Sequence, residues 1–179
     1  MLFLAVLCAG CATRPDRPLD PVPDIAGLRR TALALVNDSR RTEGLPPLEM
    51  SATLNAAAEA HAEDMARRDF YAHRSPEGRD IADRYRAAGG GDWAIIAENI
   101  SSCISCALPA GQLRAFHVDW MQSPGHRRNI LDPRVDRFGF GMAAAEGHLY
   151  AVQTFVRERE GYAGDIGALM PLVPGSAQR

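Results

Sequence analysis

The most informative stretch of the chain spans residues 120–131 and reads WMQSPGHRRNIL. Its Ser-Pro-Gly tripeptide follows an apolar, helix-like pattern and comes immediately before His126. Pro124 has no backbone donor and restricts Ser123 before it, and Gly125 accepts backbone angles that other residues avoid. We therefore expect a helix to end at this tripeptide and His126 to leave the helix axis in a defined direction.

The residues upstream carry apolar side chains at helical spacing. The clearest stripe follows Asp24, a good helix cap, and stops before Gly44. His61 lies on the apolar face of the next predicted helix. It is either a hydrogen-bonded histidine of the core or a residue of the site. Four helices are predicted: over 24–41, over 51–68, around 81–85 and over 109–122.

The apolar period changes near the C-terminus. Phe138, Phe140 and Met142 alternate with smaller or polar residues, and a second run over 149–157 follows a turn that contains Gly147. Alternation of this kind on both sides of a glycine turn predicts a β-hairpin. Helices first and antiparallel strands last favour an α+β fold.

Two further motifs precede residues 120–131. They are HRSPEG at 73–78 and AENI at 97–100. With the closing hairpin, the three motifs resemble the CAP superfamily of cysteine-rich secretory, antigen 5 and pathogenesis-related proteins, nearest to its bacterial SCP-like branch. The resemblance covers roughly residues 28–157 and implies a three-layer α-β-α sandwich with an antiparallel sheet. We predict a single CAP/SCP domain over residues 24–159.

The resemblance also implies a site. CAP proteins have a central cleft lined by two histidines and two acids, and the motifs match three of these positions to His73, Glu98 and His126. An acid follows the helix tryptophan by three residues in eukaryotic members, whereas this chain has Ser123 there. Asp119 lies one helical turn earlier and is a candidate replacement for the missing carboxylate.

Two imidazoles beside a carboxylate suit zinc or another divalent metal, and they equally suit acid–base chemistry. Glu98 has an alternative structural role, in which its carboxylate accepts hydrogen bonds from backbone amides of its own loop. Asn99 is expected to satisfy backbone groups in an irregular turn.

The sequence has no Gly-x-Ser-x-Gly or His-Glu-x-x-His motif and no lone cysteine poised as a nucleophile. Ser75 and Ser123 each precede proline, where a turn-forming role explains them. We therefore expect a non-enzymatic cleft that binds a divalent metal and an apolar or envelope ligand. The alternatives are a metal- or histidine-dependent hydrolase of peptides or envelope polymers, and a structural module that docks a partner.

The N-terminus reads as an envelope address. Residues 1–10 form an apolar run that ends in small residues before Cys11, which is typical of a lipoprotein signal remnant with Cys11 as lipid acceptor. We expect a linker over 11–23, a flexible tail over 160–179 and a true start codon upstream. The predicted protein is extracytoplasmic and membrane-anchored; a soluble protein with an apolar N-terminus is the alternative.

Two cysteines remain for the folded part, at Cys103 and Cys106. Outside the cytoplasm such a pair is expected to form a disulfide, with redox and metal roles as alternatives. The chain has 179 residues and a formal net charge of -2, and all 20 basic residues are arginines scattered along it. This charge balance argues against nucleic acid as a partner.

Overall fold

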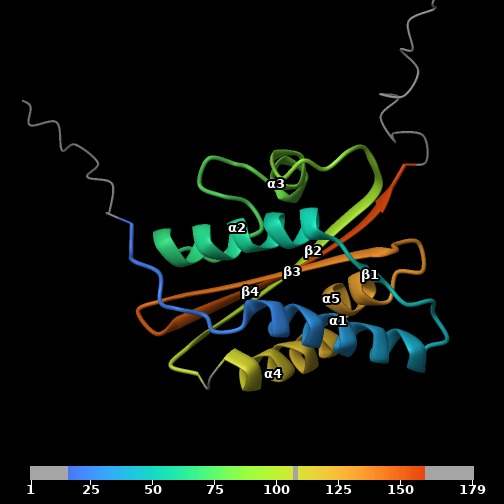
Figure 1. Ribbon diagram of the computed structural model, residues 1–179, viewed down its shortest axis with the longest axis horizontal. Coiled ribbons are helices and arrows are strands. Elements are labelled where there is room, and N and C mark those ends of the chain that lie inside the picture. The colour runs from blue at the N-terminus through green and yellow to red at the C-terminus, as the bar shows by residue number, and fades with distance from the viewer. Residues whose placement is uncertain (1–15, 107–108, 160–179) are drawn as a thin grey trace, which may run out of the picture.

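The computed structural model describes residues 16–106 and 109–159. A four-stranded sheet lies between two layers of helices, which confirms the predicted α-β-α sandwich (Figure 1). None of the helices in these two ranges is long and apolar enough to cross a membrane. The elements are α1 (Ile25–Thr42), β1 (Glu49–Met50), α2 (Ala52–Arg68), α3 (Ile81–Ala87), β2 (Trp93–Ile104), α4 (Pro109–Gln122), α5 (Pro124–Ile130), β3 (Arg137–Ala145) and β4 (His148–Glu158).

The strand order in the sheet is β1-β3-β4-β2, so β2 lies at an edge. β4 pairs antiparallel with both β3 and β2, and the short β1 pairs parallel with β3. The predicted hairpin is formed by β3 and β4 around Glu146 and Gly147, whose φ angles are 52° and 73°. Two consecutive positive φ angles give the turn a twist that matches the strands.

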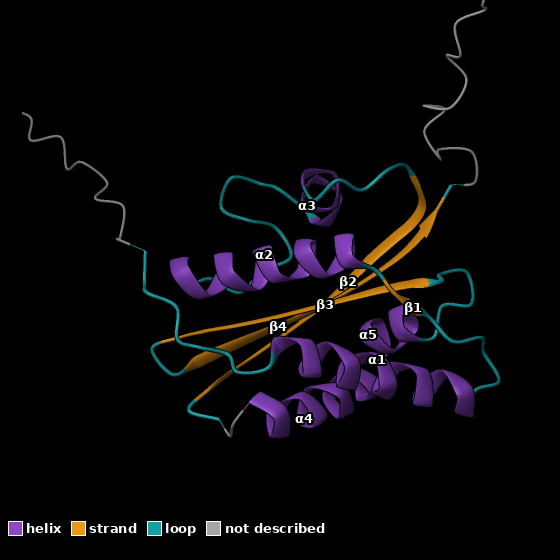
Figure 2. Cartoon of the chain, in the orientation of Figure 1, coloured by secondary structure: helices purple, strands orange, loops and turns teal. Residues whose placement is uncertain are grey.

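The two faces of β3 explain its alternating sequence. Phe138, Phe140 and Met142 enter the main apolar core together with residues of α1 and α4. These two helices lie on the opposite side of the sheet from α2 (Figure 2). Gly139 and Gly141 face α2, where an added Cβ would lie 2.3 Å from the Leu54 carbonyl carbon and 2.2 Å from the Glu59 nitrogen. The glycines therefore allow α2 to pack directly on the sheet.

Strand β2 corrects the sequence analysis, which expected an irregular turn and loop after Glu98. The strand pairs with β4 from Trp93 opposite Glu158 to Ile104 opposite His148. Polar residues interrupt its apolar alternation because β2 is an edge strand and one of its faces carries the candidate site. The sequence of β2 therefore lacks the regular apolar alternation that predicts a strand.

Residues 120–131 also differ from expectation. α4 does end at Gln122, but Pro124 is the first residue of α5, and His126 lies in the first turn of that helix rather than on a turn. Proline is favoured at the first position of a helix, since no intrahelical donor is lost there. The same tripeptide thus ends one helix and begins the next.

The N-terminal segment from residue 16 packs against the sandwich. The Arg17 amide donates to the Arg67 carbonyl at 2.7 Å, and the buried Arg17 guanidinium donates to the Ala66 carbonyl at 3.0 Å. Asp20 forms a bridge with Ala144 of β3. Cys11, the apolar run over 1–10 and the tail over 160–179 lie outside the described residues, and the proposed domain boundaries stay predictions.

Cys103 and Cys106 form a disulfide with Cα atoms 6.0 Å apart, as expected. The loop that they close is short, and chain entropy assigns it only about 2 kcal/mol. The Ser105 amide donates to the Gly147 carbonyl at 2.9 Å, which attaches the clipped end of β2 to the hairpin turn. The disulfide therefore shapes one end of the sheet rather than holding the domain together.

Candidate functional site

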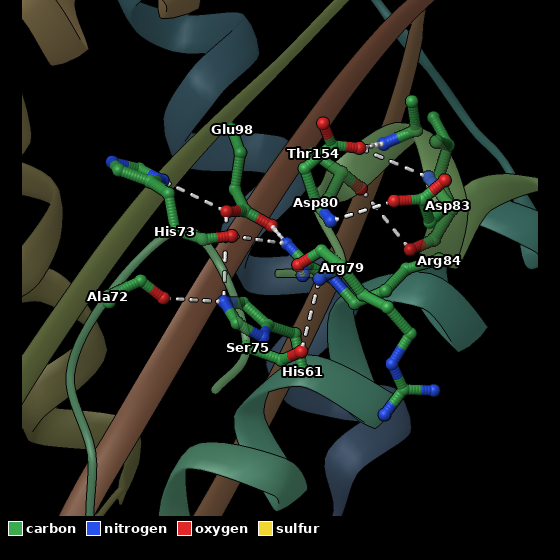
Figure 3. Close-up of polar contacts among 12 residues, drawn as sticks. His61, Ala72, His73, Ser75, Arg79, Asp80, Asp83, Arg84, Glu98 and Thr154 are labelled. Carbon is green, nitrogen blue, oxygen red and sulfur yellow. Dashed lines mark hydrogen bonds and ion pairs between the residues drawn. The ribbon is translucent and has the colours of Figure 1, made fainter. Parts of the chain in front are cut away.

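Glu98 is the centre of the candidate site. Its side chain leaves β2 toward α2 and α3 and is only 3% exposed. One carboxylate oxygen, Oε2, accepts from Arg84 Nη2 at 2.7 Å, and the other, Oε1, lies 2.9 Å from Nδ1 of His73 (Figure 3). The structural role expected for Glu98 was to accept hydrogen bonds from backbone amides. Its carboxylate instead forms an ion pair with Arg84 and a hydrogen bond with His73.

His73 lies in the loop between α2 and α3, and its side chain is 55% exposed. A carboxylate only accepts hydrogen bonds, so the Nδ1 of His73 carries the hydrogen in its bond to Glu98. Whenever the ring is neutral, this tautomer leaves the lone pair on Nε2. In Figure 3 this nitrogen points away from Glu98. His73 is therefore oriented as a ligand or a base.

His61 approaches the same carboxylate from α2. Its Nε2 lies 2.9 Å from the Ala72 carbonyl oxygen and 3.8 Å from Glu98 Oε1. Burial is the main cause that lowers the pKa of His61, which favours the neutral ring. His61 thus holds the residue before His73 in place from inside the core.

His126 reaches the site from the opposite helical layer. Asn99 Nδ2 donates to the His126 carbonyl at 3.2 Å, and Asn129 Nδ2 donates to the Glu98 carbonyl at 3.2 Å. These two bonds attach the start of α5 to residues 98 and 99 of β2. The pKa of His126 is lowered, first by burial and then by a coulombic contribution from His73. The structure therefore brings His73 and Glu98 into contact and attaches the start of α5, which carries His126, to the same part of β2.

The outer edge of β2 is covered at the same place. The Ile100 carbonyl accepts from Tyr71 Oη and from Trp120 Nε1, each at 3.0 Å. Together with Asn129 at the Glu98 carbonyl, these side chains occupy the edge acceptors beside the site. An exposed edge strand invites pairing with other chains, and these contacts oppose it.

Asp119 and Ser123 are the two weaker candidates. Asp119 is exposed, Ser123 is half-buried, and the Ser123 amide donates to the Asp119 carbonyl at 3.0 Å. Within residues 16–106 and 109–159, neither side chain forms a hydrogen bond or ion pair with His73 or His126. Their contribution to a metal site stays a prediction.

Sequence reasoning missed three residues that build the site: Tyr71, Arg84 and Asn129. Tyr71 and Arg84 lie outside the three motifs, and Asn129 lies within residues 120–131 but was not proposed as a site residue. No signal in the sequence singled them out, because their partners are distant in the chain.

The donor set fits a divalent metal in part. No group of three His, Cys, Asp or Glu side chains in the described part of the chain is arranged to hold an ion. Nε2 of His73 and the ring of His126 are available, whereas Glu98 is already engaged by Arg84 and His73. Any metal held here would have imidazole ligands from the protein, with Glu98 behind one of them.

The family model described as the cysteine-rich secretory protein family (CAP) matches residues 33–156, and the chain belongs to this family. The protein YkwD of Bacillus subtilis is 30% identical over 117 residues, which are 65% of this chain and 43% of YkwD. An extracellular SCP-domain protein of Bacillus anthracis has a TM-score of 0.63 and 26% identity, over 79% of this chain and 45% of that one.

An outer surface protein of Borrelia burgdorferi has a TM-score of 0.67 at 16% identity, over 80% of this chain and 99% of that one. At this identity the likeness concerns the fold alone. The chain spans less than half the length of YkwD and of the Bacillus anthracis protein.

Proposed function

We propose that this chain is an extracytoplasmic CAP-domain protein that binds a divalent metal, zinc foremost, through Nε2 of His73 and the imidazole of His126. The observation that carries the proposal is the 2.9 Å contact between His73 Nδ1 and Glu98 Oε1. A carboxylate behind a histidine fixes its tautomer and raises its basicity, as is common at zinc sites. Zinc accepts imidazole nitrogen readily, and water would complete the coordination.

The electrostatics of the site support the same proposal. Metal binding requires neutral imidazoles, so ligands with a low pKa lose less affinity to protonation. The pKa of His126 is lowered from its ordinary value, mainly by burial. The protein NaASP2, which is 13% identical to this chain and similar in fold with a TM-score of 0.56, has a solved structure with Zn2+. That ion is a property of NaASP2, and here it motivates zinc as the first metal to test.

An apolar or envelope ligand completes the proposal. A cavity of about 500 Å³ lies between the starts of α1 and α4. Its lining combines apolar residues with polar and charged ones: Pro23, Leu28, Pro109 and Ala110 with Asp24, Arg30 and Thr31. A lipid on Cys11 would keep the domain at a membrane, in keeping with the extracellular and outer-surface relatives. Metabolic labelling with a clickable fatty acid tests the anchor, and a labelled chain that loses its label in Cys11→Ser supports it.

Titration calorimetry of zinc into the chelator-free protein tests the metal site. We expect one ion per chain and at least a tenfold weaker binding in His73→Ala and in His126→Ala. His148→Ala is the matched control, because His148 lies in β4 beside Tyr150 and away from Glu98. Zinc binding that survives the loss of both site histidines contradicts the proposal.

The Glu98–His73 pair also favours a second function, hydrolysis of a peptide or envelope polymer. A carboxylate behind an imidazole is the arrangement of a general base, and here the base would be His73 rather than Glu98. Release of soluble fragments from peptide and cell-wall substrates measures this activity. Turnover that disappears in His73→Gln supports the hydrolase, and fragment release at the same rate in wild type and variant rejects it.

A further inference from the structure

Arg84 is the residue that determines what the Glu98 carboxylate can do. It lies in α3, and its side chain is only 8% exposed. Nη2 donates to Glu98 Oε2 at 2.7 Å and to the His73 carbonyl at 3.1 Å, while Nη1 donates to the Arg79 carbonyl at 3.1 Å. One guanidinium therefore connects the acid of the site, the backbone of the candidate ligand and the loop before α3 (Figure 3).

The position of Arg84 is itself fixed by the start of α3. Asp80 caps the helix by accepting from the Ala82 and Asp83 amides, and the Asp83 carboxylate returns a bond to the Asp80 amide. Such a reciprocal cap holds the first turn rigid, and Arg84 follows directly after it. Its Nη2 then meets a carboxylate that is also buried.

This ion pair restricts coordination by Glu98. A metal that took Glu98 as a ligand would have to displace a guanidinium that is itself buried, and it would leave that charge without its partner. The other carboxylate oxygen is held by His73. Glu98 therefore acts on a metal through His73, and the chain offers imidazole nitrogen at the site.

We propose that Arg84 is a positioning residue that holds Glu98 out of the metal's coordination sphere and so makes the site selective for metals that prefer nitrogen ligands. The inference rests on the proposed metal-binding function. Carboxylate oxygen suits manganese and magnesium, whereas imidazole suits zinc, copper and nickel. Loss of Arg84 would free an oxygen ligand beside His73 and would narrow the preference for zinc over manganese.

The test compares Arg84→Gln with Arg86→Gln, a control on the same helix whose exposed side chain pairs with Asp83. Zinc and manganese affinities are measured by titration calorimetry on the full chain. We expect the ratio of the two affinities to fall at least tenfold in Arg84→Gln and to stay within twofold of wild type in the control. Equal ratios in wild type and Arg84→Gln overturn the proposal, as does a parallel loss of both affinities.

A second measurement needs no metal. Nitrogen-15 chemical shifts at pH 8 report which ring nitrogen of His73 carries the hydrogen, and we expect Nδ1 in wild type and a mixture of both tautomers in Arg84→Gln. A wild-type ring protonated at Nε2 overturns the proposal even if the variant fails to fold. If wild type shows the Nδ1 tautomer but binds no zinc, the metal function fails while the positioning of Glu98 and His73 stands. Arg84→Lys, which keeps the charge without the fork, is expected to give intermediate metal selectivity and serves if Arg84→Gln is unfolded.

Discussion

Arg40 and Arg41 are neighbours at the end of α1 with the same side chain and opposite environments. Arg40 is fully buried, and its guanidinium donates to the carbonyls of Pro46, Ile130 and Asp132 at 2.8–2.9 Å. Burial lowers its pKa from the ordinary value. Arg41, with a side chain that is 78% exposed, forms a surface pair with Asp38.

We predict that Arg40→Ala lowers the free energy of unfolding by at least about 3 kcal/mol, because it leaves three acceptor carbonyls at the junction of α1 and α5 without their donor. Urea denaturation measures the loss. Arg41→Ala is the matched control and should change stability by less than about 0.5 kcal/mol, since exposed ion pairs contribute little. Equal effects of the two substitutions would show that burial of Arg40 does not stabilise the fold.

Gly141 lies where α2 packs on the sheet. Its role there is steric rather than conformational. An added Cβ would lie 2.2–2.4 Å from backbone atoms of Ala58 and Glu59, and backbone cannot move aside as a flexible side chain can. The helix would have to shift off the sheet, together with Ala58 and Ala62, which pack in the core between them.

We therefore predict that Gly141→Ala destabilises the protein by about 1–3 kcal/mol or more through overpacking. Gly125→Ala is the control, because the nearest atom to its added Cβ is Arg128 Nη2 at 3.8 Å and alanine favours the helical backbone of α5. Differential scanning calorimetry should show a lower Tm for Gly141→Ala and an unchanged or higher Tm for the control. A Tm equal to wild type in Gly141→Ala would argue that α2 moves freely over the sheet.

The stability of the whole molecule should depend on pH, because each helical layer contains a buried histidine. Burial is the largest cause that lowers the pKa of His61 in α2 and of His117 in α4. His117 also lies 2.9 Å from Ser39 Oγ across the α1–α4 contact. The lowered pKa favours the neutral form of both rings in the folded chain, whereas both bind a proton near pH 6.5 in the unfolded chain.

We predict that the folded state loses stability as the pH falls below about 6.5, by up to about 1.4 kcal/mol per pH unit for each of these two histidines. The sign follows from the lowered folded pKa: the unfolded chain binds more protons in this window, and the contribution is complete above it. Carboxylates such as Glu77, whose pKa is lowered to about 2 beside Arg68, titrate below this window.

Urea denaturation at pH 7.5 and pH 5.5 measures the effect, and His117→Gln is the control variant. Glutamine can still bond to Ser39 and does not titrate, so the loss between the two pH values should become smaller in this variant. Stability that is constant or rises toward pH 5.5 would contradict the assignment of neutral buried histidines.

Much of the architecture was predictable because it depends on local periodicity. The spacing of apolar and turn residues predicts the helices over 24–41 and 51–68, the end of α4 and the β3–β4 hairpin. Strand β2 and α5 were not predicted correctly. In β2 the site interrupts the apolar alternation, and in α5 the proline that ends one helix also begins another.

The motifs around His73, Glu98 and His126 were sufficient to indicate the family and to nominate these residues for the site, because motif order and local capping are properties of the linear chain. Their convergence required the folded chain, since 25 residues separate His73 from Glu98 and 27 separate Asn99 from the carbonyl of His126 that it binds. Only the tertiary structure assigned Arg84 to the Glu98 carboxylate. Buried ion pairs form between residues that packing brings together, and no spacing along the chain encodes such a meeting.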